Sequence, residues 1–290
     1  MKKIIVCFLL IVNTICFGQS SYSGTLGEYP ITLVTYHYSD GVSLAYYSYN
    51  KYDTPITING NLKGRELTLY EKKSKNQVIA TLTFSNFEID DTVIRGKWVN
   101  TKTKKELNIY LKKDFDINYG DDLEWDTKEL LQSKSTKKHY FKTIISKKKR
   151  QFYGRVIGVK VFEKRTDRLI QKINLDCQLF GIDNVSVDDY NFDGIQDFSV
   201  FEASYTGPNT SSIYILKEPK SENYFVSDFS GTSLEFNSKE KLIYEHNQCC
   251  GGSRHTNATY KVIDNKMVLI ERKCIEYDKE KEDYVNVKCE

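Results

Sequence analysis

Short segments in which apolar and polar residues alternate recur along most of the chain, and turn residues separate them. In one such segment, Leu67 and Leu69 alternate with more polar neighbours. A period of two places alternate side chains on opposite faces of a strand, so one face is buried and the other is wet. The chain also contains 21 Tyr and 15 Phe but only 4 Pro, a composition that suits strands. The pattern therefore predicts an all-β fold of short antiparallel strands.

Residues 19–113 read as an antiparallel β-meander that forms an N-terminal domain. Asp40-Gly41 lies between two of its apolar segments and predicts a two-residue hairpin turn. About seven short strands at regular spacing favour a barrel or a tightly curled sheet. We expect these strands at residues 31–38, 42–49, 56–58, 66–71, 78–84, 92–99 and 106–111.

Residues 114–140 interrupt the alternation, and we expect one short helix and a linker there. The segment Asp122–Gln132 has acidic residues at its start and three leucines as its apolar positions, which favours a helix. The polar residues 133–138 then predict the linker between two domains. Residues 141–290 return to short strands with loop-rich connections, which fit propeller blades or a sandwich.

Residues 1–18 have the features of a secretory signal peptide. Two lysines precede the apolar run 4–12, and Cys16-Phe17-Gly18 offers a cleavage site before Gln19. The alternatives are an uncleaved anchor and a lipoprotein, but a lipoprotein needs a small residue where Ile15 stands. No later segment is apolar enough to cross a membrane. We therefore expect a periplasmic or secreted protein with no membrane span after cleavage.

The overall charge is nearly balanced, with 42 Lys and Arg against 39 Asp and Glu. This balance argues against a nucleic-acid partner. Locally the charge is uneven, because residues 134–150 carry eight Lys or Arg and no acid, while residues 114–129 are mostly acidic. We interpret these as two solvated segments that face each other. The alternative is a basic patch for an acidic surface or partner.

The most specific motif is the run from Asp189 to Asp197, which reads D-x-N-x-D-G-x-x-D. Its carboxylates repel one another unless a cation lies between them. Oxygen donors around a central glycine are typical of a calcium loop, but Val200 stands where an EF-hand has its last glutamate. The alternative is an Asx-rich turn that binds nothing. We predict a weak, structural Ca²⁺ site whose ligands are Asp189, Asn191, Asp193, the Ile195 carbonyl and Asp197.

Two other segments could form a binding surface. The turn-rich loop after the acidic motif could insert into the cleft of a partner, with Tyr205 as an aromatic anchor and Asn209 beside it, or be a plain connection. Six tyrosines lie between Tyr36 and Tyr52. They could form a stacking surface for sugar, although we favour a structural role because aromatic residues fill small β-cores.

Five cysteines remain after cleavage, and in an oxidising compartment some should pair. Apart from Cys177, the candidates are Cys249, Cys250, Cys274 and Cys289. The adjacent pair cannot easily bridge to each other, so we expect Cys274 to bridge to one of them across a hairpin. Cys289 would then attach the C-terminal tail.

The residues 246–255 combine two His with two Cys. A disulfide-pinned, glycine-rich hairpin loop is the favoured interpretation. The alternatives are a zinc site and a Cys249 nucleophile with His255 as its base, but the spacing matches no common zinc motif. The chain contains no nucleophile elbow, P-loop, HExxH or dinucleotide motif. We therefore predict no catalytic residues.

Residues 150–275 resemble the calcium-binding periplasmic lysozyme inhibitors, the immunity proteins of bacterial type IV killing systems. The residues that carry the resemblance are the acidic motif, Gly207-Pro208-Asn209, Tyr214, Phe225, Tyr260 and Leu269-Ile270. The resemblance implies a β-propeller-like domain, a structural calcium ion and inhibition of a cell-wall hydrolase. The N-terminal meander is similar to small β-domains found beside this module in exported bacterial proteins.

The residue patterns predict an exported, calcium-stabilised binding protein that is not an enzyme, and the resemblance implies that it inhibits a peptidoglycan hydrolase. The alternative is a cell-surface carbohydrate-binding or adhesion module that uses the tyrosine-rich meander.

Overall fold

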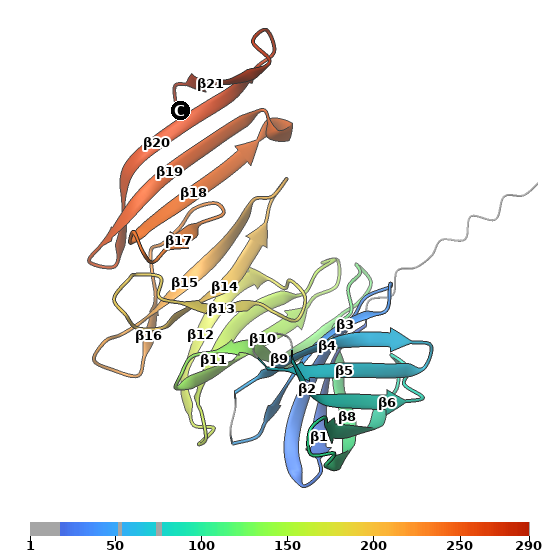
Figure 1. The fold of residues 1–290 in the computed structure, drawn as a ribbon. Coiled ribbons are helices and arrows are strands. Elements are labelled where there is room, and N and C mark those ends of the chain that lie inside the picture. The colour runs from blue at the N-terminus through green and yellow to red at the C-terminus, as the bar shows by residue number, and fades with distance from the viewer. Residues whose placement is uncertain (1–17, 52–53, 74–76, 290) are drawn as a thin grey trace, which may run out of the picture.

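The computed structural model describes residues 18–51, 54–73 and 77–289, and strands joined by turns make up this part of the chain (Figure 1). Within these residues there is no α-helix, and the one helical element is a single 3₁₀ turn at Cys250–Gly252. The prediction of an all-β fold is therefore confirmed. The predicted signal peptide lies outside the described residues except for Gly18, which begins the first strand.

The N-terminal strands close into a barrel, as the regular spacing of the meander predicted. Each strand pairs with the next, and the first strand pairs with the eighth to complete the ring. The core of the barrel is a single cluster of buried apolar residues, among them Leu67, Leu69 and Leu82. Its strands are β1 (Gly18–Leu26), β2 (Tyr29–His37), β3 (Val42–Tyr49), β4 (Ile56–Lys63), β5 (Glu66–Lys72), β6 (Val78–Ser85), β7 (Val93–Asn100) and β8 (Glu106–Asp116).

Gly60 shows why closure needs glycine at some positions. A Cβ atom on this residue would lie 1.8 Å from the carbonyl oxygen of Thr68 on the next strand. No side chain can occupy that space, so the backbones of β4 and β5 approach closely only because a glycine stands there.

Three antiparallel meander sheets follow the barrel, and Figure 1 shows them in a row that leads away from it. The first sheet contains β9 (Trp125–Ser135), β10 (His139–Lys147), β11 (Arg155–Glu163) and β12 (Leu169–Gln178). The second contains β13 (Val185–Asp188), β14 (Asp197–Ser204), β15 (Thr210–Lys217) and β16 (Tyr224–Val226). The third contains β17 (Glu235–Asn237), β18 (Leu242–Cys249), β19 (Arg254–Ile263), β20 (Lys266–Asp278) and β21 (Asp283–Val287).

The helix predicted at Asp122–Gln132 is wrong, because most of this segment forms strand β9. Leu130 and Leu131 are adjacent in sequence and both are buried, so both faces of the strand are covered. They pair with Thr143 and Lys142 of β10. Pairing with a neighbouring strand therefore overrides the weak helical pattern of the sequence. The predicted linker at 133–138 is instead the end of β9 and the turn into β10, since β9 continues to Ser135 and pairs with β10 in the same sheet.

The barrel is attached to the sheets by a shared core. Val34 and Tyr46 belong to barrel strands, yet they pack in one cluster with buried residues of the first and second sheets. The Tyr46 hydroxyl is buried and donates to the carbonyls of Leu131 at 2.7 Å and Ile182 at 3.0 Å. Tyr46 therefore connects the barrel strand β3 with strand β9 of the first sheet and with the segment between β12 and β13.

Candidate functional site

The acidic motif forms the turn between the paired strands β13 and β14. Phe192 and Gly194 have positive φ angles of 62° and 88°, which bend the chain back on itself. The Asp189 carboxylate accepts hydrogen bonds from the backbone N–H groups of Asp193 at 3.0 Å and Gly194 at 2.8 Å. The Asp193 carboxylate in turn accepts one from Ile195 at 2.8 Å.

Asp197 is the buried member of this loop, with no exposed surface. Its oxygens accept backbone hydrogen bonds from Tyr190 at 3.0 Å and Lys217 at 2.7 Å. Burial raises the pKa of this carboxyl to about 7, the two hydrogen bonds oppose that shift, and the charges of Asp193 and Asp189 add to it. A cation in the loop would offset this unfavourable burial of negative charge.

The donor set of the loop fits calcium in its chemistry. The structure brings Asp189, Asn191, Asp193 and Asp197 into one turn. Each carboxylate oxygen already accepts one hydrogen bond, from a backbone N–H or, for one oxygen of Asp193, from the Asn191 side-chain amide, and each can accept a further partner. As placed, no group of three or more His, Cys, Asp or Glu among the described residues could hold a metal ion. Calcium binding therefore stays a prediction.

The same loop joins the second sheet to the third. Asn191 donates to the side-chain oxygen of Asn265 at 2.8 Å, and Lys241 donates to the carbonyl of Phe192 at 3.3 Å. Anything that stabilises this turn also stabilises the junction between the two sheets.

The loop between β14 and β15 exposes one of its two predicted contact residues. The ring of Tyr205 is 53% exposed, and its hydroxyl is 3.1 Å from the Ser211 hydroxyl. Asn209 is buried instead, and its side chain donates to the Gln248 carbonyl at 2.7 Å and accepts from the Gln248 N–H at 3.1 Å. Asn209 therefore fixes the loop to β18, while Tyr205 faces solvent.

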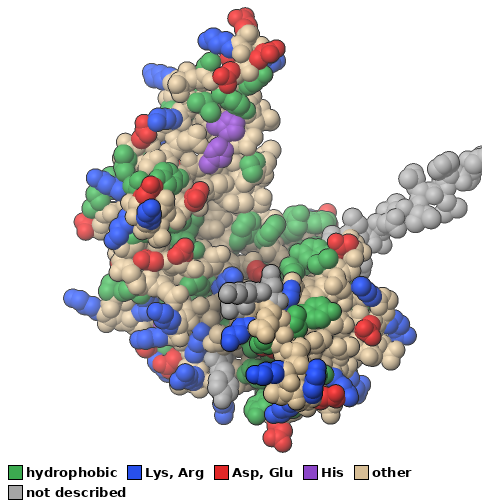
Figure 2. Space-filling view, viewed as in Figure 1, with side chains coloured by type: hydrophobic (Ala, Val, Ile, Leu, Met, Phe, Trp, Pro, Cys, Tyr) green, Lys and Arg blue, Asp and Glu red, His purple; other side chains and the backbone are tan. Residues whose placement is uncertain are grey.

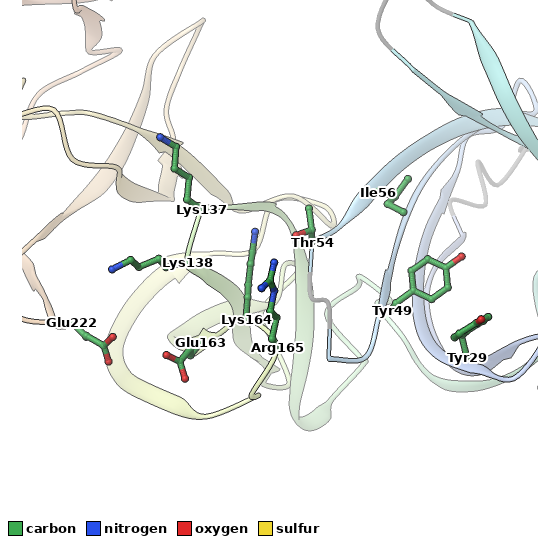
Figure 3. A pocket seen from close by; sticks show the side chains of 10 residues that line it. All are labelled: Tyr29, Tyr49, Thr54, Ile56, Lys137, Lys138, Glu163, Lys164, Arg165 and Glu222. Atoms are coloured by element: carbon green, nitrogen blue, oxygen red, sulfur yellow. The ribbon is translucent and has the colours of Figure 1, made fainter.

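A cleft of about 890 Å³ lies between the barrel and the first sheet (Figure 3). Tyr29, Tyr49, Thr54 and Ile56 form its barrel wall. The opposite wall carries four cationic side chains and two carboxylates: Lys137, Lys138, Lys164, Arg165, Glu163 and Glu222. The sequence did not predict this cleft, because its two walls come from distant segments. The one signal was the basic run at 134–150, which supplies two of the lysines.

The tyrosines of the N-terminal meander have different roles. Tyr46 and Tyr47 are buried, as the structural interpretation of this cluster expected. Tyr36 and Tyr38 stack on each other with ring centroids 4.3 Å apart. Tyr49 reaches the cleft, and Tyr52 lies outside the described residues.

The disulfide links Cys274 to Cys289, so the expected bridge from Cys274 to Cys249 or Cys250 is wrong. Strand β19 lies between β18 and β20 and separates Cys274 from the pair, whereas β21 lies on its other side and leads to Cys289. Cys289 does attach the tail, as predicted. Cys249 and Cys250 are exposed free thiols, with their sulfur atoms 2.8 Å apart at the tip of a hairpin.

Two histidines lie near this hairpin tip, and Figure 2 shows histidine side chains together on the surface of the third sheet. His246 and His255 have ring centroids 5.2 Å apart. The ring of His255 also lies 2.9 Å from the Gly252 carbonyl, so it is held by the turn itself. As placed, the His and Cys side chains of this hairpin do not form a metal-binding group, in line with the rest of the described residues.

Comparison with known proteins gave no match among family models, curated proteins or solved structures. Throughout residues 18–51, 54–73 and 77–289, no helix is long and apolar enough to span a membrane.

Proposed function

We propose that this chain is an exported, calcium-stabilised binding protein that inhibits a peptidoglycan hydrolase and is not itself an enzyme. The observation that carries the proposal is the Tyr205 loop. It combines an exposed aromatic ring with a rigid base, because the Asn209 side chain holds the loop on Gln248 through two hydrogen bonds.

A loop of this kind suits the active-site cleft of a hydrolase. Aromatic side chains that fill a pocket supply much of the binding energy at protein interfaces. A loop that is already ordered loses little conformational entropy when it binds. Glycoside hydrolases place two carboxylates in a concave site that such a loop could block.

Calcium has a structural role in this proposal. Asp189, Asn191, Asp193, Asp197 and the Ile195 carbonyl would hold the ion, which would neutralise part of the negative charge in the turn. The turn connects the second and third sheets, and the Tyr205 loop lies between the same two sheets. We further propose that the three meander sheets are propeller-like blades, since each has the sequential antiparallel strand order of a blade.

The test is inhibition of a panel of lysozyme-like peptidoglycan hydrolases by residues 19–290, with binding measured in parallel. We expect at least one enzyme to be bound and slowed. Tyr205→Ala should weaken that inhibition by about tenfold or more, as expected for loss of an aromatic anchor. Tyr110→Ala is the matched control, because this tyrosine is similarly exposed but lies on the barrel. If no enzyme is bound or slowed, the proposal fails.

The second candidate is a cell-surface carbohydrate-binding or adhesion module. The observation that favours it is the cleft, where Tyr29 and Tyr49 offer aromatic surface beside cationic side chains. Retention of the protein on insoluble glycan would support this candidate.

A further inference from the structure

We propose that the cleft between the barrel and the first sheet binds a carboxylated oligosaccharide. The proposal deepens the second candidate function and rests on it, and it does not depend on inhibition of a hydrolase. Its basis is the pairing of an aromatic wall with a cationic wall across one cavity (Figure 3).

The aromatic wall is fixed by the barrel. Tyr49 ends β3 and Tyr29 begins β2, and the N–H of Asn50 donates to the Pro30 carbonyl at 3.0 Å, which keeps these strand ends together. The rings of Tyr29 and Tyr49 are 5.9 Å apart and nearly perpendicular, so they brace each other by edge-to-face contact. Tyr29 is 51% exposed. A sugar ring can pack its apolar C–H face on such a surface while the phenol hydroxyl remains available for a hydrogen bond.

The cationic wall follows from the strand order of the first sheet. Its β9–β10 and β11–β12 turns lie at the same end of the sheet, because the sheet is an antiparallel meander. The N–H of Lys164 donates to the Lys138 carbonyl at 2.9 Å and joins the two turns. Lys137 and Lys138 from one turn therefore lie beside Lys164 and Arg165 from the other.

The carboxylates of this wall do not cancel its positive charge. Arg168 forms ion pairs with both, at 3.2 Å to Glu163 and 2.7 Å to Glu222. The pKa of each glutamate is lowered, chiefly by its hydrogen bond to Arg168. Among the lining residues of this wall, four cationic side chains stand against two carboxylates, so the wall carries a net positive charge that favours a carboxylate ligand.

Three features favour an acidic saccharide over an acidic peptide. The volume of about 890 Å³ suits a short oligomer. A carboxylated sugar carries a flat ring face and a charged group on one unit, which matches the two opposite walls. An acidic peptide would use the lysines but has no ring for Tyr29 and Tyr49.

The first experiment is calorimetric titration of residues 19–290 with short oligomers of galacturonate, mannuronate and glucuronate at low salt. We expect at least one to bind, and its methyl ester, which has the same rings without the charges, to bind about tenfold more weakly or worse. Added salt should weaken binding of the acid and leave the ester unchanged. Equal binding of acid and ester would overturn the acidic preference while keeping the carbohydrate function. No binding of any oligomer would overturn both.

The second experiment places the ligand in the cleft. Lys138→Gln should weaken binding of the acidic oligomer and leave binding of its ester unchanged, whereas Tyr29→Ala should weaken binding of both. Lys239→Gln and Tyr110→Ala are matched controls outside the cleft and should change neither affinity. The saccharide assignment would be overturned if a poly-glutamate peptide bound as tightly as the saccharide. It would also be overturned if Tyr29→Ala had no effect on binding of the saccharide. Tyr205→Ala should leave these affinities unchanged, which separates this site from the proposed inhibitory loop.

Discussion

The short strands of the barrel and those of the third sheet are stabilised in different ways. The barrel closes on itself, so its described strands have no free edge, and its interior is filled by a cluster of apolar residues from its own strands and turns. The third sheet is open, and Leu269 and Ile270 of β20 remain about half exposed. The small core beneath it is shared with the second sheet through Tyr190, Tyr214 and Phe229. The barrel is therefore stabilised from within, whereas the outer sheets depend on their junctions.

Both proposed binding surfaces lie at such junctions rather than inside one unit. The cleft lies between the barrel and the first sheet, and the Tyr205 loop is fixed to the third sheet by Asn209. Substitutions in the barrel core and at the junctions should therefore affect different parts of the molecule.

The barrel should lose stability in acid because of His37. This histidine is buried, 2.8 Å from the Ser43 hydroxyl, and burial lowers its pKa from 6.5 to about 4. Below pH 6.5 the unfolded chain takes up a proton that the folded barrel does not. Stability is therefore fully present above that pH and falls by about 3 kcal/mol as the pH drops towards 4.

Denaturant unfolding followed over this pH range measures the effect. His37→Gln should reduce the pH dependence of the unfolding free energy of the barrel and leave that of the sheets unchanged. An unchanged pH profile in this variant would contradict the assignment to His37.

The third sheet should depend on its disulfide. Cys289→Ser removes the bridge to Cys274, which spans 15 residues, and should lower the free energy of unfolding by about 2 to 3 kcal/mol. Hydrogen exchange should become faster in β20 and β21, with the barrel unaffected. Faster exchange throughout the chain would show that the third sheet and the barrel unfold as one unit.

The junction of the barrel with the first two sheets should depend on Tyr46. Tyr46→Phe keeps the ring but removes the hydroxyl that donates to Leu131 and Ile182, so it should cost about 1 to 2 kcal/mol. Tyr110→Phe, on the exposed face of the barrel, is the matched control and should change the unfolding free energy little. Equal effects of the two variants in thermal unfolding would contradict this role of the Tyr46 hydroxyl.

The comparison also explains what the sequence could predict. Strong alternation around Leu67 and Leu69 predicted most barrel strands, because the pattern is local. It did not predict β1, which has three serines among its nine residues. In the structure β1 pairs with β8, almost a hundred residues away, and Ser23 donates to Asp114 at 2.6 Å. The strand that completes the ring therefore depends on a contact that no local pattern contains.

Of the two candidate sites, the sequence predicted the acidic loop but not the cleft. The acidic motif is contiguous, so its position and its turn could be predicted from spacing alone. A patch for an acidic partner was the alternative interpretation of the basic run at 134–150, and the tyrosines opposite it come from residues 29 and 49. The helix predicted at Asp122–Gln132 failed for the same reason, because pairing of β9 with β10 is a tertiary contact.

The most direct test of the account is hydrogen exchange of residues 19–290 with and without calcium at about 1 mM, near the affinity range of extracellular modules. Calcium should slow exchange in the second and third sheets, which meet at the acidic loop, and leave the barrel unchanged. Asp193→Ala should abolish the difference. If exchange in the two sheets did not change, or if the barrel were protected equally, the claim that calcium stabilises the second and third sheets would be contradicted.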